Sequence, residues 1–185
     1  MAIVFDIGLI NFRRLNVNDL DYMYKWLNHG YAAEWYGKKQ FTMKEIEEKY
    51  LPYINNEKPT QAYLILYDDK PIGYIQTYRI QDYEDYAKAI DVDENASGLD
   101  LFIGEDDYIH KGLGKYIISK FLDEIVFALY DTESCILGPE PDNIAAIKTY
   151  EKVGFKHIKT VETEDGAEYI MRLGKDEFTK FLGEY

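Results

Sequence analysis

The segment from Ser97 to Leu129 constrains the fold most, because it joins a strand to an amphipathic helix through a glycine-bearing turn. The run from 99 to 103 is almost entirely apolar, which is typical of a buried strand. The first N–H groups of a helix have no helical partner and carry the positive end of its dipole. This arrangement therefore predicts an anion site. The apolar residues that mark the helix are Ile117, Ile118, Phe121, Leu122, Ile125 and Leu129.

The turn before this helix has the composition of a phosphate site. Gly112 and Gly114 have no Cβ, so the backbone there can approach a phosphate closely. Lys111 and Lys115 add positive charge on either side of Leu113. We therefore expect a phosphate-bearing cofactor that the backbone of this turn holds.

Length and charge limit the classes of partner. The chain has 185 residues, 46% hydrophobic and 30% charged, which suits one globular domain over residues 1–185. A formal net charge of -13 argues against nucleic acid as the main partner. The acidity fits a cationic ligand, or it reflects only a well-solvated surface. The sequence leaves open whether the protein is a monomer or a homodimer.

Cysteine and histidine usage points away from disulfides and metals. The single cysteine, Cys135, cannot form an intramolecular disulfide, and it lies in a strand-like run where a buried, inert thiol is expected. His29, His110 and His157 lack metal-ligand spacing, so we expect no metal. No segment resembles a signal peptide or a membrane span, so we expect a cytoplasmic protein that does not act at membranes.

The rest of the chain alternates strands and helices, which indicates an α/β or α+β fold. Thr42 and Glu45 form a capping box for a helix over 43–50 that Pro52 closes, and Asn18 or Asp19 caps a helix over 20–27. We expect loops at 33–37 and 81–96. At 3–5 and 10–13 we expect a short opening strand pair or an extended lead-in. The other expected elements are hairpins of 62–67 with 71–78 and of 155–161 with 167–173, a strand at 134–137, a helix over 144–153 capped by Asp142 or Asn143 and ended by Gly154, and a C-terminal helix.

Two motifs in this order resemble those of the GNAT (Gcn5-related) N-acetyltransferases. The first is the turn from Ile109 to Gly114, although Ile109 stands where the family usually has Arg or Gln. The second is the segment from Asn143 to Phe155, with an Asn, a Tyr-bearing helix and Gly-Phe. The resemblance covers nearly the whole chain and implies a mixed central sheet with splayed strands flanked by helices.

The resemblance also implies acetyl-CoA as the cofactor. The turn from Lys111 to Lys115 would hold its pyrophosphate, and the backbone of Phe102 and Ile103 would pair with its pantetheine arm. Asn143 and Ala146, at the start of the second motif, would also contact it, and a helix-capping role for Asn143 is compatible with that.

Further features are similar to aminoglycoside 6'-N-acetyltransferases. They are the stretches 34–37, 50–52, 71–78, 98–100 and 111–114. Two departures bear on the substrate: Leu101 follows Asp100 where those enzymes usually have Gln, and Gly138 replaces an Asp that is implied to help hold the aminoglycoside. The implied activity is acetylation of the 6'-amino group of an aminoglycoside, which confers resistance.

Acetyl transfer to an amine needs a proton acceptor for the ammonium and a proton donor for the leaving thiolate. Asp100 is the candidate base, acting directly or through water, and the alternative is a solvent-facing acid on its strand. Tyr150 matches the family's general acid, but with 18 Tyr in the chain it is equally a core aromatic at helical spacing from Ile147.

The amine-donor pocket would combine flat rings with acids, which suits a polycation. The expected lining residues are Trp35, Tyr36, Gln76, Tyr78, Asp82, Glu84 and Asp100. For Asp82 and Glu84, a solvated acidic loop explains the sequence equally well.

Two alternatives to the aminoglycoside stay open. The first is acetylation of another amine, such as a polyamine, a hydroxamate-siderophore precursor or a peptide N-terminus. The second is a non-catalytic acyl-CoA-binding sensor, in which Asp100 would be dispensable while acetyl-CoA still binds.

Overall fold

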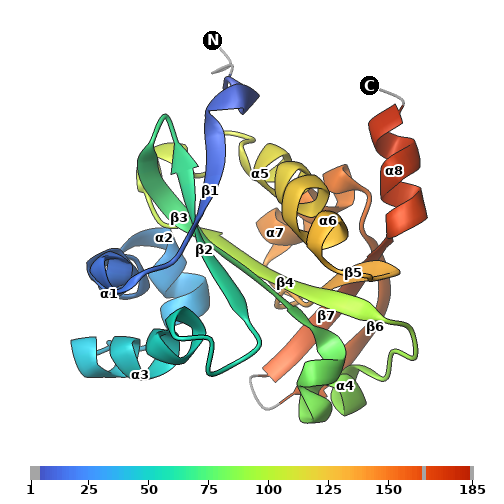
Figure 1. The fold of residues 1–185 in the computed structure, drawn as a ribbon, viewed down its shortest axis with the longest axis horizontal. Helices are drawn as coiled ribbons and strands as arrows, with labels where there is room; N and C mark the ends of the chain where they lie inside the picture. Colours follow the sequence, from blue (N-terminus) through green and yellow to red (C-terminus); the bar gives the residue numbers. More distant parts are fainter. Residues whose placement is uncertain (1–4, 164–165, 184–185) are drawn as a thin grey trace. The chain divides into compact units, whose positions relative to one another are not determined.

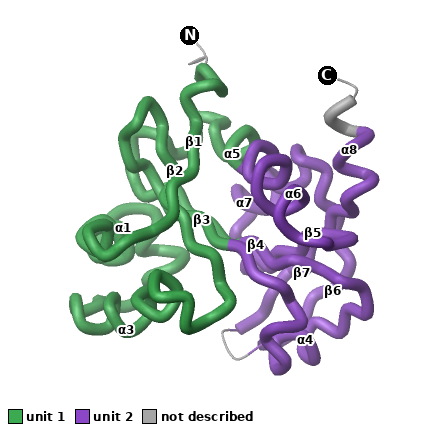
Figure 2. Tube along the Cα trace, viewed as in Figure 1, with its two compact units in different colours: residues 1–76, 100–117 green, residues 77–99, 118–185 purple. Residues whose placement is uncertain are grey.

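The computed structural model describes residues 5–163 and 166–183, which fall into two compact units (Figure 2). Unit 1 comprises residues 1–76 and 100–117, and unit 2 comprises residues 77–99 and 118–185. The boundaries between the units fall inside continuous elements, at 76/77 in β3 (Lys70–Arg79), at 99/100 in β4 (Ala96–Ile103) and at 117/118 in α5 (Gly114–Phe121).

Unit 1 pairs the N-terminal strand with a hairpin and adds helices (Figure 1). Its register runs antiparallel from Ile10 opposite Tyr67 to Arg14 opposite Tyr63. Asp68 and Asp69 form the hairpin turn with φ of 50° and 59°, the left-handed conformation that two-residue hairpin turns favour. Apart from short 3-10 turns, the elements wholly inside unit 1 are β1 (Ile10–Arg14), α1 (Leu20–Asn28), α2 (Gly30–Ala32), a π-helical turn (Ala33–Gly37), α3 (Met43–Ile54) and β2 (Gln61–Tyr67).

Unit 2 holds the C-terminal half of the chain. Its strand β5 (Ser134–Leu137) pairs in parallel with the start of β4, from Ala96 to Gly98, and antiparallel with β7 (Gly166–Gly174). The remaining elements are α4 (Glu84–Ile90), a π-helical turn (Leu122–Val126), α6 (Phe127–Leu129), α7 (Ile144–Val153), β6 (Lys156–Thr163) and α8 (Lys175–Gly183).

Seven strands among the described residues form a mixed sheet in the order β1-β2-β3-β4-β5-β7-β6. The β4–β5 ladder covers only Ala96 to Gly98, and β4 continues beyond it to Ile103. This mixed sheet with flanking helices confirms the expected fold class.

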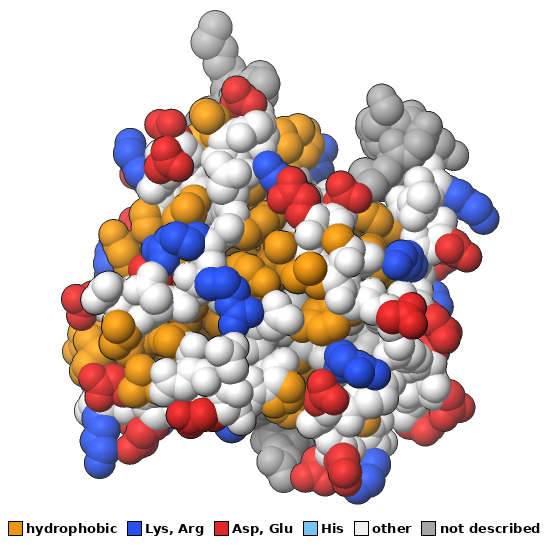
Figure 3. All heavy atoms as spheres, in the orientation of Figure 1, with side chains coloured by type: hydrophobic (Ala, Val, Ile, Leu, Met, Phe, Trp, Pro, Cys, Tyr) orange, Lys and Arg blue, Asp and Glu red, His pale blue; other side chains and the backbone are white. Residues whose placement is uncertain are grey.

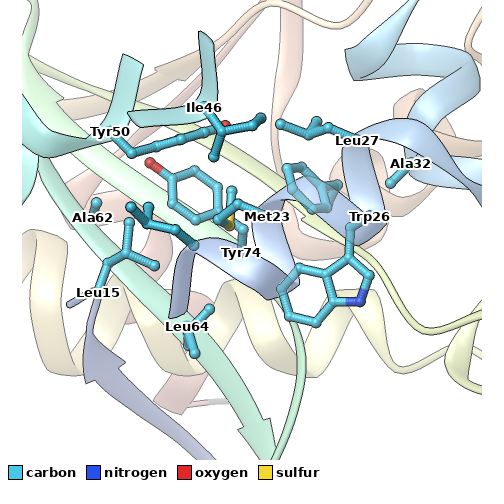
Figure 4. Close-up of a cluster of buried hydrophobic side chains, with 12 residues drawn as sticks. Leu15, Met23, Trp26, Leu27, Ala32, Ile46, Tyr50, Ala62, Leu64 and Tyr74 are labelled. Carbon is cyan, nitrogen blue, oxygen red and sulfur yellow. The ribbon is translucent and has the colours of Figure 1, made fainter. Parts of the chain in front are cut away.

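Each unit has its own buried core. In unit 1, α1 and α3 pack their apolar faces on β2 and β3, and Figure 4 shows Met23, Trp26, Ile46, Tyr50 and Tyr74 gathered in one cluster. In unit 2, the core around α4 contains Ile80, Ile90, Ala96, Ile136 and Ile170.

Most of the expected elements are confirmed. The Thr42–Glu45 capping box is present, Asn143 caps α7 by accepting from the Ala146 N–H at 3.1 Å, and Gly154 ends α7 with φ 106°. Cys135 is fully buried. Within the expected extended lead-in, 3 and 4 lie outside the described residues, and residues 164 and 165 of the last turn lie outside them as well.

Four local expectations differ from the structure. Residues 33–37 form a π-helical turn closed by Lys38 N–H donating to Ala33 O at 2.8 Å. The sequence predicted a loop because a segment of this length is too short to show a helical periodicity of apolar residues. Pro52 lies inside α3, near its end: the proline lacks one N–H donor, but the helix continues past it to Ile54, and Asn55 N–H donates to Leu51 O at 2.8 Å.

The third concerns 81–96, which contains the helix α4 instead of an open loop. Ile90, the last residue of α4, and Ile80, in the 3-10 turn Ile80–Asp82 before it, are fully buried, and they lie too far apart to give a periodic signal. The cap of α1 also differs: Asp19 occupies the N-cap, but its carboxylate accepts from Arg13 and the Asn16 N–H instead.

No helix in the described parts of the chain has both the length and the apolar character that a membrane crossing requires.

Candidate active site

Asp100 lies on β4 of unit 1 and is held by a side chain of the neighbouring strand. Gln76 on β3 donates from Nε2 to Asp100 Oδ2 at 2.8 Å, and its Oε1 accepts from the Tyr74 hydroxyl at 2.7 Å. Asp100 and Gln76 are half-buried, whereas Tyr74 is only 3% exposed. The carboxylate is therefore placed within a strand and oriented by a partner, while it stays within reach of solvent.

Aromatic rings of unit 1 surround Tyr74. Its ring stacks on Phe102, with centroids 5.6 Å apart, and meets Tyr50 edge-on at 5.4 Å. The exposed Tyr36 also contacts Phe102, at 5.2 Å, so the predicted pocket residue Tyr36 joins this cluster. Burial, followed by the nearby Tyr53 and the negative charge of Asp100, raises the pKa of Tyr50 well above its usual value. Tyr50 therefore contributes an uncharged ring to the cluster.

Trp35 belongs to the π-helical turn next to Tyr36. It is half-buried and faces Tyr31, with ring centroids 6.4 Å apart, and Tyr31 in turn meets the His110 ring edge-on at 5.0 Å. Ring contacts therefore run from Trp35 through Tyr31 to His110, the residue before Lys111.

The turn at 110–114 has the backbone that an anion site needs. His110 and Gly112 have φ of 57° and 79°, and left-handed residues alternating along a turn aim successive N–H groups to one side. A Cβ placed on Gly112 would meet no atom within 4 Å, so this face of the turn is open. Leu113 is buried, which leaves only its backbone for a ligand.

The two lysines of the turn differ. Lys111 is exposed, whereas Lys115 is half-buried and its Nζ lies 4.5 Å from the Tyr116 ring centroid. Of the two ammonium groups, that of Lys111 is therefore the more accessible to a phosphate. Phe102 is core, so a role in cofactor binding falls to its backbone and to that of the half-buried Ile103.

In unit 2, the second motif begins at the cap of α7. Asn143 is 8% exposed and its Oδ1 accepts from the Ala146 N–H, so that N–H is already engaged within the helix. Tyr150 is 6% exposed and meets Phe155 edge-on at 6.2 Å, which agrees with the core packing that the sequence also allowed.

The other predicted pocket residues of unit 2 behave differently from one another. The Tyr78 ring lies against Gly98 and meets Tyr83 edge-on at 5.1 Å. Asp82 is exposed, and Glu84 is exposed and lies 3.7 Å from Lys88 one helical turn away. For Glu84, the solvated-face interpretation therefore has the stronger support.

Gly138, one of the two departures from the aminoglycoside pattern, has a carboxylate next to it. A Cβ at Gly138 would collide with Glu168 Oε2, so the Glu168 side chain fills that space. Glu168 on β7 accepts from the Tyr86 hydroxyl at 3.0 Å and from the Thr163 hydroxyl at 2.9 Å. An acid therefore lies beside position 138, although another strand supplies it.

Charge is spread over the surface instead of forming a single patch on the side that Figure 3 shows, where acidic and basic side chains alternate. One acid near the first motif is paired: Glu105 accepts from Lys25 at 2.7 Å and from Trp26 at 2.8 Å. Burial alone would raise the pKa of Glu105, but these two donors outweigh it and lower the pKa. In the ranges 5–163 and 166–183, no three His, Cys, Asp or Glu side chains gather as metal ligands would.

The family model for the acetyltransferase (GNAT) domain matches residues 16–163. The chain belongs to the GNAT acetyltransferase family. The matched range includes the 109–114 turn, Asp100 and the helix that carries Tyr150.

Relatives of this GNAT acetyltransferase share most of its length. The aminoglycoside N(6')-acetyltransferase type 1 of Klebsiella pneumoniae is 30% identical over 164 residues, which are 88% of this chain and 81% of that enzyme. The crystal structure of the aminoglycoside acetyltransferase AAC(6')-Ib with coenzyme A has a TM-score of 0.84 at 28% identity, covering 92% of this chain and 98% of that one. The same enzyme with coenzyme A and kanamycin has a TM-score of 0.83 at 27% identity, with the same coverage.

Two residues next to the candidate site residues were not singled out from the sequence. In the sequence, Tyr74 is one of many aromatic residues in strands. The available signal was its spacing of two from Gln76, because residues two apart lie on the same face of a strand. Glu168 gave no signal, since 30 residues separate it from position 138 in the sequence.

Proposed function

We propose that this acetyltransferase moves the acetyl group of acetyl-CoA to a primary amine of a cationic small molecule, the 6'-amino group of an aminoglycoside. The observation that carries the proposal is the 30% identity, over 88% of this chain, to an enzyme named for that reaction. The net charge of -13 is in keeping with a polycationic substrate.

Asp100 receives the proton of the substrate ammonium, directly or through one water. A primary ammonium has an ordinary pKa of about 10.4, so it needs an acceptor before its nitrogen can attack. The hydrogen bond from Gln76 Nε2 supports this role, because it holds one carboxylate oxygen and so defines the direction of the other.

The residues present at the 110–114 turn fit the phosphates of acetyl-CoA. The open face of Gly112, the positive φ of His110 and the exposed Lys111 supply backbone donors and one cation for a phosphate group. The backbone of Phe102 and Ile103, and the start of α7 at Asn143 and Ala146, complete the proposed binding residues. When bound, acetyl-CoA supplies the acetyl group as a thioester.

Tyr150 is the proposed proton donor, from its Oη to the leaving sulfur. A carbon–nitrogen bond forms and the carbon–sulfur bond breaks. The nitrogen loses two protons on the way from ammonium to amide: Asp100 takes the first, and the second replaces, by way of solvent, the proton that Tyr150 gives to the sulfur. No covalent acyl-enzyme is involved, and the full burial of Cys135 favours direct transfer.

The residues proposed to bind the amine are the rings of Trp35 and Tyr36 with Asp100 in unit 1, and the ring of Tyr78 with Asp82 in unit 2. To the acids of unit 2 we add Glu168, because its carboxylate occupies the space beside Gly138. We include the whole chain in a single acetyltransferase domain, since the unit boundaries fall within β3, β4 and α5 and not in linkers. A cytoplasmic location follows from where acetyl-CoA is supplied.

A panel of amines tests the proposal. CoA-thiol release is measured with acetyl-CoA and aminoglycosides, polyamines, or peptides with a free N-terminus. We expect kcat/KM to be highest for aminoglycosides by at least about a hundredfold, which is the discrimination that several matched polar contacts give. Faster turnover of polyamines or peptides would keep the chemistry and reject the substrate. Acetyl-CoA binding without turnover of any amine would indicate a sensor.

A further inference from the structure

A buried phenol lies at the end of the hydrogen bonds that orient Asp100. The Tyr74 hydroxyl donates to Gln76 Oε1 at 2.7 Å, and Gln76 Nε2 donates to Asp100 Oδ2 at 2.8 Å. All three residues belong to unit 1. From this geometry we infer that Tyr74 is a positioning residue, which fixes the Gln76 amide and through it the carboxylate of Asp100.

The two hydrogen bonds can be donated in one direction only, from Tyr74 to Gln76 and from Gln76 to Asp100. An ionised carboxylate only accepts hydrogen bonds, so the Gln76 group that faces Asp100 must be the NH2. The amide oxygen then faces Tyr74, whose hydroxyl must donate. Both ends of the Gln76 amide are thereby specified, and rotating the amide by a half-turn would break both bonds.

Packing makes Tyr74 a firm anchor. Its side chain is 3% exposed and lies between the stacked ring of Phe102 and the edge-on ring of Tyr50, as Figure 4 shows for the two tyrosines. Gln76, in contrast, is half-buried and has a long side chain with several rotatable bonds. Because the neighbouring rings hold the Tyr74 ring in place, the Tyr74 hydroxyl favours one of the side-chain conformations that Gln76 would otherwise sample.

This inference rests on the proposed role of Asp100 as the base. A carboxylate that must take a proton from a bound ammonium depends on its orientation, and small displacements of a catalytic group lower the rate steeply. It also changes the interpretation of Gln76, which the sequence placed in the pocket lining: its amide holds Asp100.

The chain contains a matched control. Tyr63 on β2 is 6% exposed, and its hydroxyl donates at 2.9 Å to Gln61 Oε1, also two residues away on its strand. Gln61 also accepts from Arg14 at 3.1 Å, on the strand pair of β1 and β2, so this pair repeats the contact outside the proposed site. Tyr63→Phe therefore costs one buried hydroxyl without affecting the base.

The first measurement uses the free protein and needs no substrate. Side-chain amide signals of Gln76 are assigned in the nitrogen-15 spectrum by their loss in Gln76→Met. We expect Tyr74→Phe and Asp100→Asn each to move these amide proton signals upfield, because each removes or weakens a hydrogen bond of the amide. Tyr63→Phe should leave them in place. Unchanged Gln76 signals in Tyr74→Phe would overturn the inference.

The second measurement is kinetic, on the purified full chain with its preferred amine. Tyr74→Phe should lower kcat about fivefold to tenfold, the value of one hydrogen bond, and leave the KM for acetyl-CoA unchanged. In a Gln76→Ala background it should change kcat less than about twofold, because the path to Asp100 is already cut. Tyr63→Phe should not change kcat.

Other outcomes separate this inference from the proposed function. If Tyr74→Phe loses only thermal stability, as Tyr63→Phe does, and keeps its kcat, Tyr74 is a structural residue and the inference fails. If the wild-type protein turns over no amine at all, the proposed function fails, and the Gln76 amide signals alone decide whether Tyr74 positions Asp100.

Discussion

The side-chain nitrogen of Gln76 donates to the carboxylate of Asp100 across 2.8 Å, from β3 to β4. This contact brings a polar pair together on neighbouring strands that are otherwise mainly apolar, at Tyr74, Ile75, Leu99 and Leu101. A polar pair at such a place needs a reason beyond packing, because apolar side chains would fill the space at a smaller desolvation cost. The proposed acid–base role of Asp100 supplies that reason.

Removing the charge of Asp100 should therefore stop the reaction and spare the cofactor. We expect Asp100→Asn to lower kcat/KM for the amine by about a hundredfold to ten-thousandfold, the usual contribution of a general base. Acetyl-CoA affinity, measured by calorimetry, should stay within about twofold. A variant that retains near-normal turnover would exclude Asp100 as the base.

The turn at Gly112 gives a test of the cofactor site. Gly112→Ala places a Cβ on the open face of a residue with φ 79°, where a phosphate would lie. We expect the KM for acetyl-CoA to rise at least about tenfold, in addition to a stability loss of about 1 kcal/mol from the left-handed backbone.

Gly166→Ala is the matched control for Gly112→Ala. Gly166 also has a positive φ, 117°, and also has no atom within 4 Å of an added Cβ, but it lies in the last hairpin. It should lose stability only. An equal rise in KM in the two variants would mean that the effect at Gly112 is structural.

Substitutions of Glu168 and Glu84 distinguish an acid of the proposed pocket from an acid of the solvated surface. Glu168→Gln should raise the KM for an aminoglycoside about threefold to tenfold, because its carboxylate lies beside Gly138 in the proposed pocket. Glu84→Gln should leave the KM unchanged, since Glu84 is exposed and pairs with Lys88. Steady-state kinetics with saturating acetyl-CoA measure the two effects, and the opposite ranking would move the pocket toward α4.

The ion pair of Glu94 and Arg172 predicts how stability depends on pH. Glu94 accepts from Arg172 Nε at 2.5 Å and from Nη2 at 2.8 Å, and from the Ser134 hydroxyl at 2.6 Å. These bonds, those from Arg172 first, lower the pKa of Glu94 despite its burial. The pair therefore stabilises the fold fully above the ordinary carboxyl pKa of about 4.3, and this contribution is lost as the pH falls through the lower folded-state pKa.

Glu94→Gln should consequently cost about 1.5–3 kcal/mol of unfolding free energy at pH 7. The difference from wild type should shrink as the pH falls below about 4.3, because Glu94 of the unfolded chain then takes up a proton before Glu94 of the folded protein does. Urea denaturation at several pH values measures both free energies. A difference that stays constant with pH would show that the loss comes from packing and not from charge.

Local patterns were sufficient to predict most elements. The hairpin of β2 and β3, the Thr42–Glu45 capping box and the Gly154 cap each depend on residues within a few positions of one another, and all three are confirmed. The 109–114 turn was predicted for the same reason. Its glycines and the following helical periodicity lie in one short stretch.

Features that depend on distant residues were not predictable. The bond from Gln76 to Asp100 requires the register of β3 against β4, which the sequence does not contain. Glu168 reaches position 138 only because β7 pairs with β5, with Leu137 opposite Met171. The helix α4 is fixed by Ile80 and Ile90, which bury themselves against residues from other strands of unit 2.

The most direct test of the account uses two aminoglycosides that are identical except for an amino or a hydroxyl group at the 6' position. CoA-thiol release is followed for each, with acetyl-CoA saturating. We expect turnover of the 6'-amino compound alone, and loss of that turnover in Asp100→Asn. Equal turnover of the two compounds would place the acetylated group elsewhere on the substrate and would contradict the proposed 6'-amine specificity.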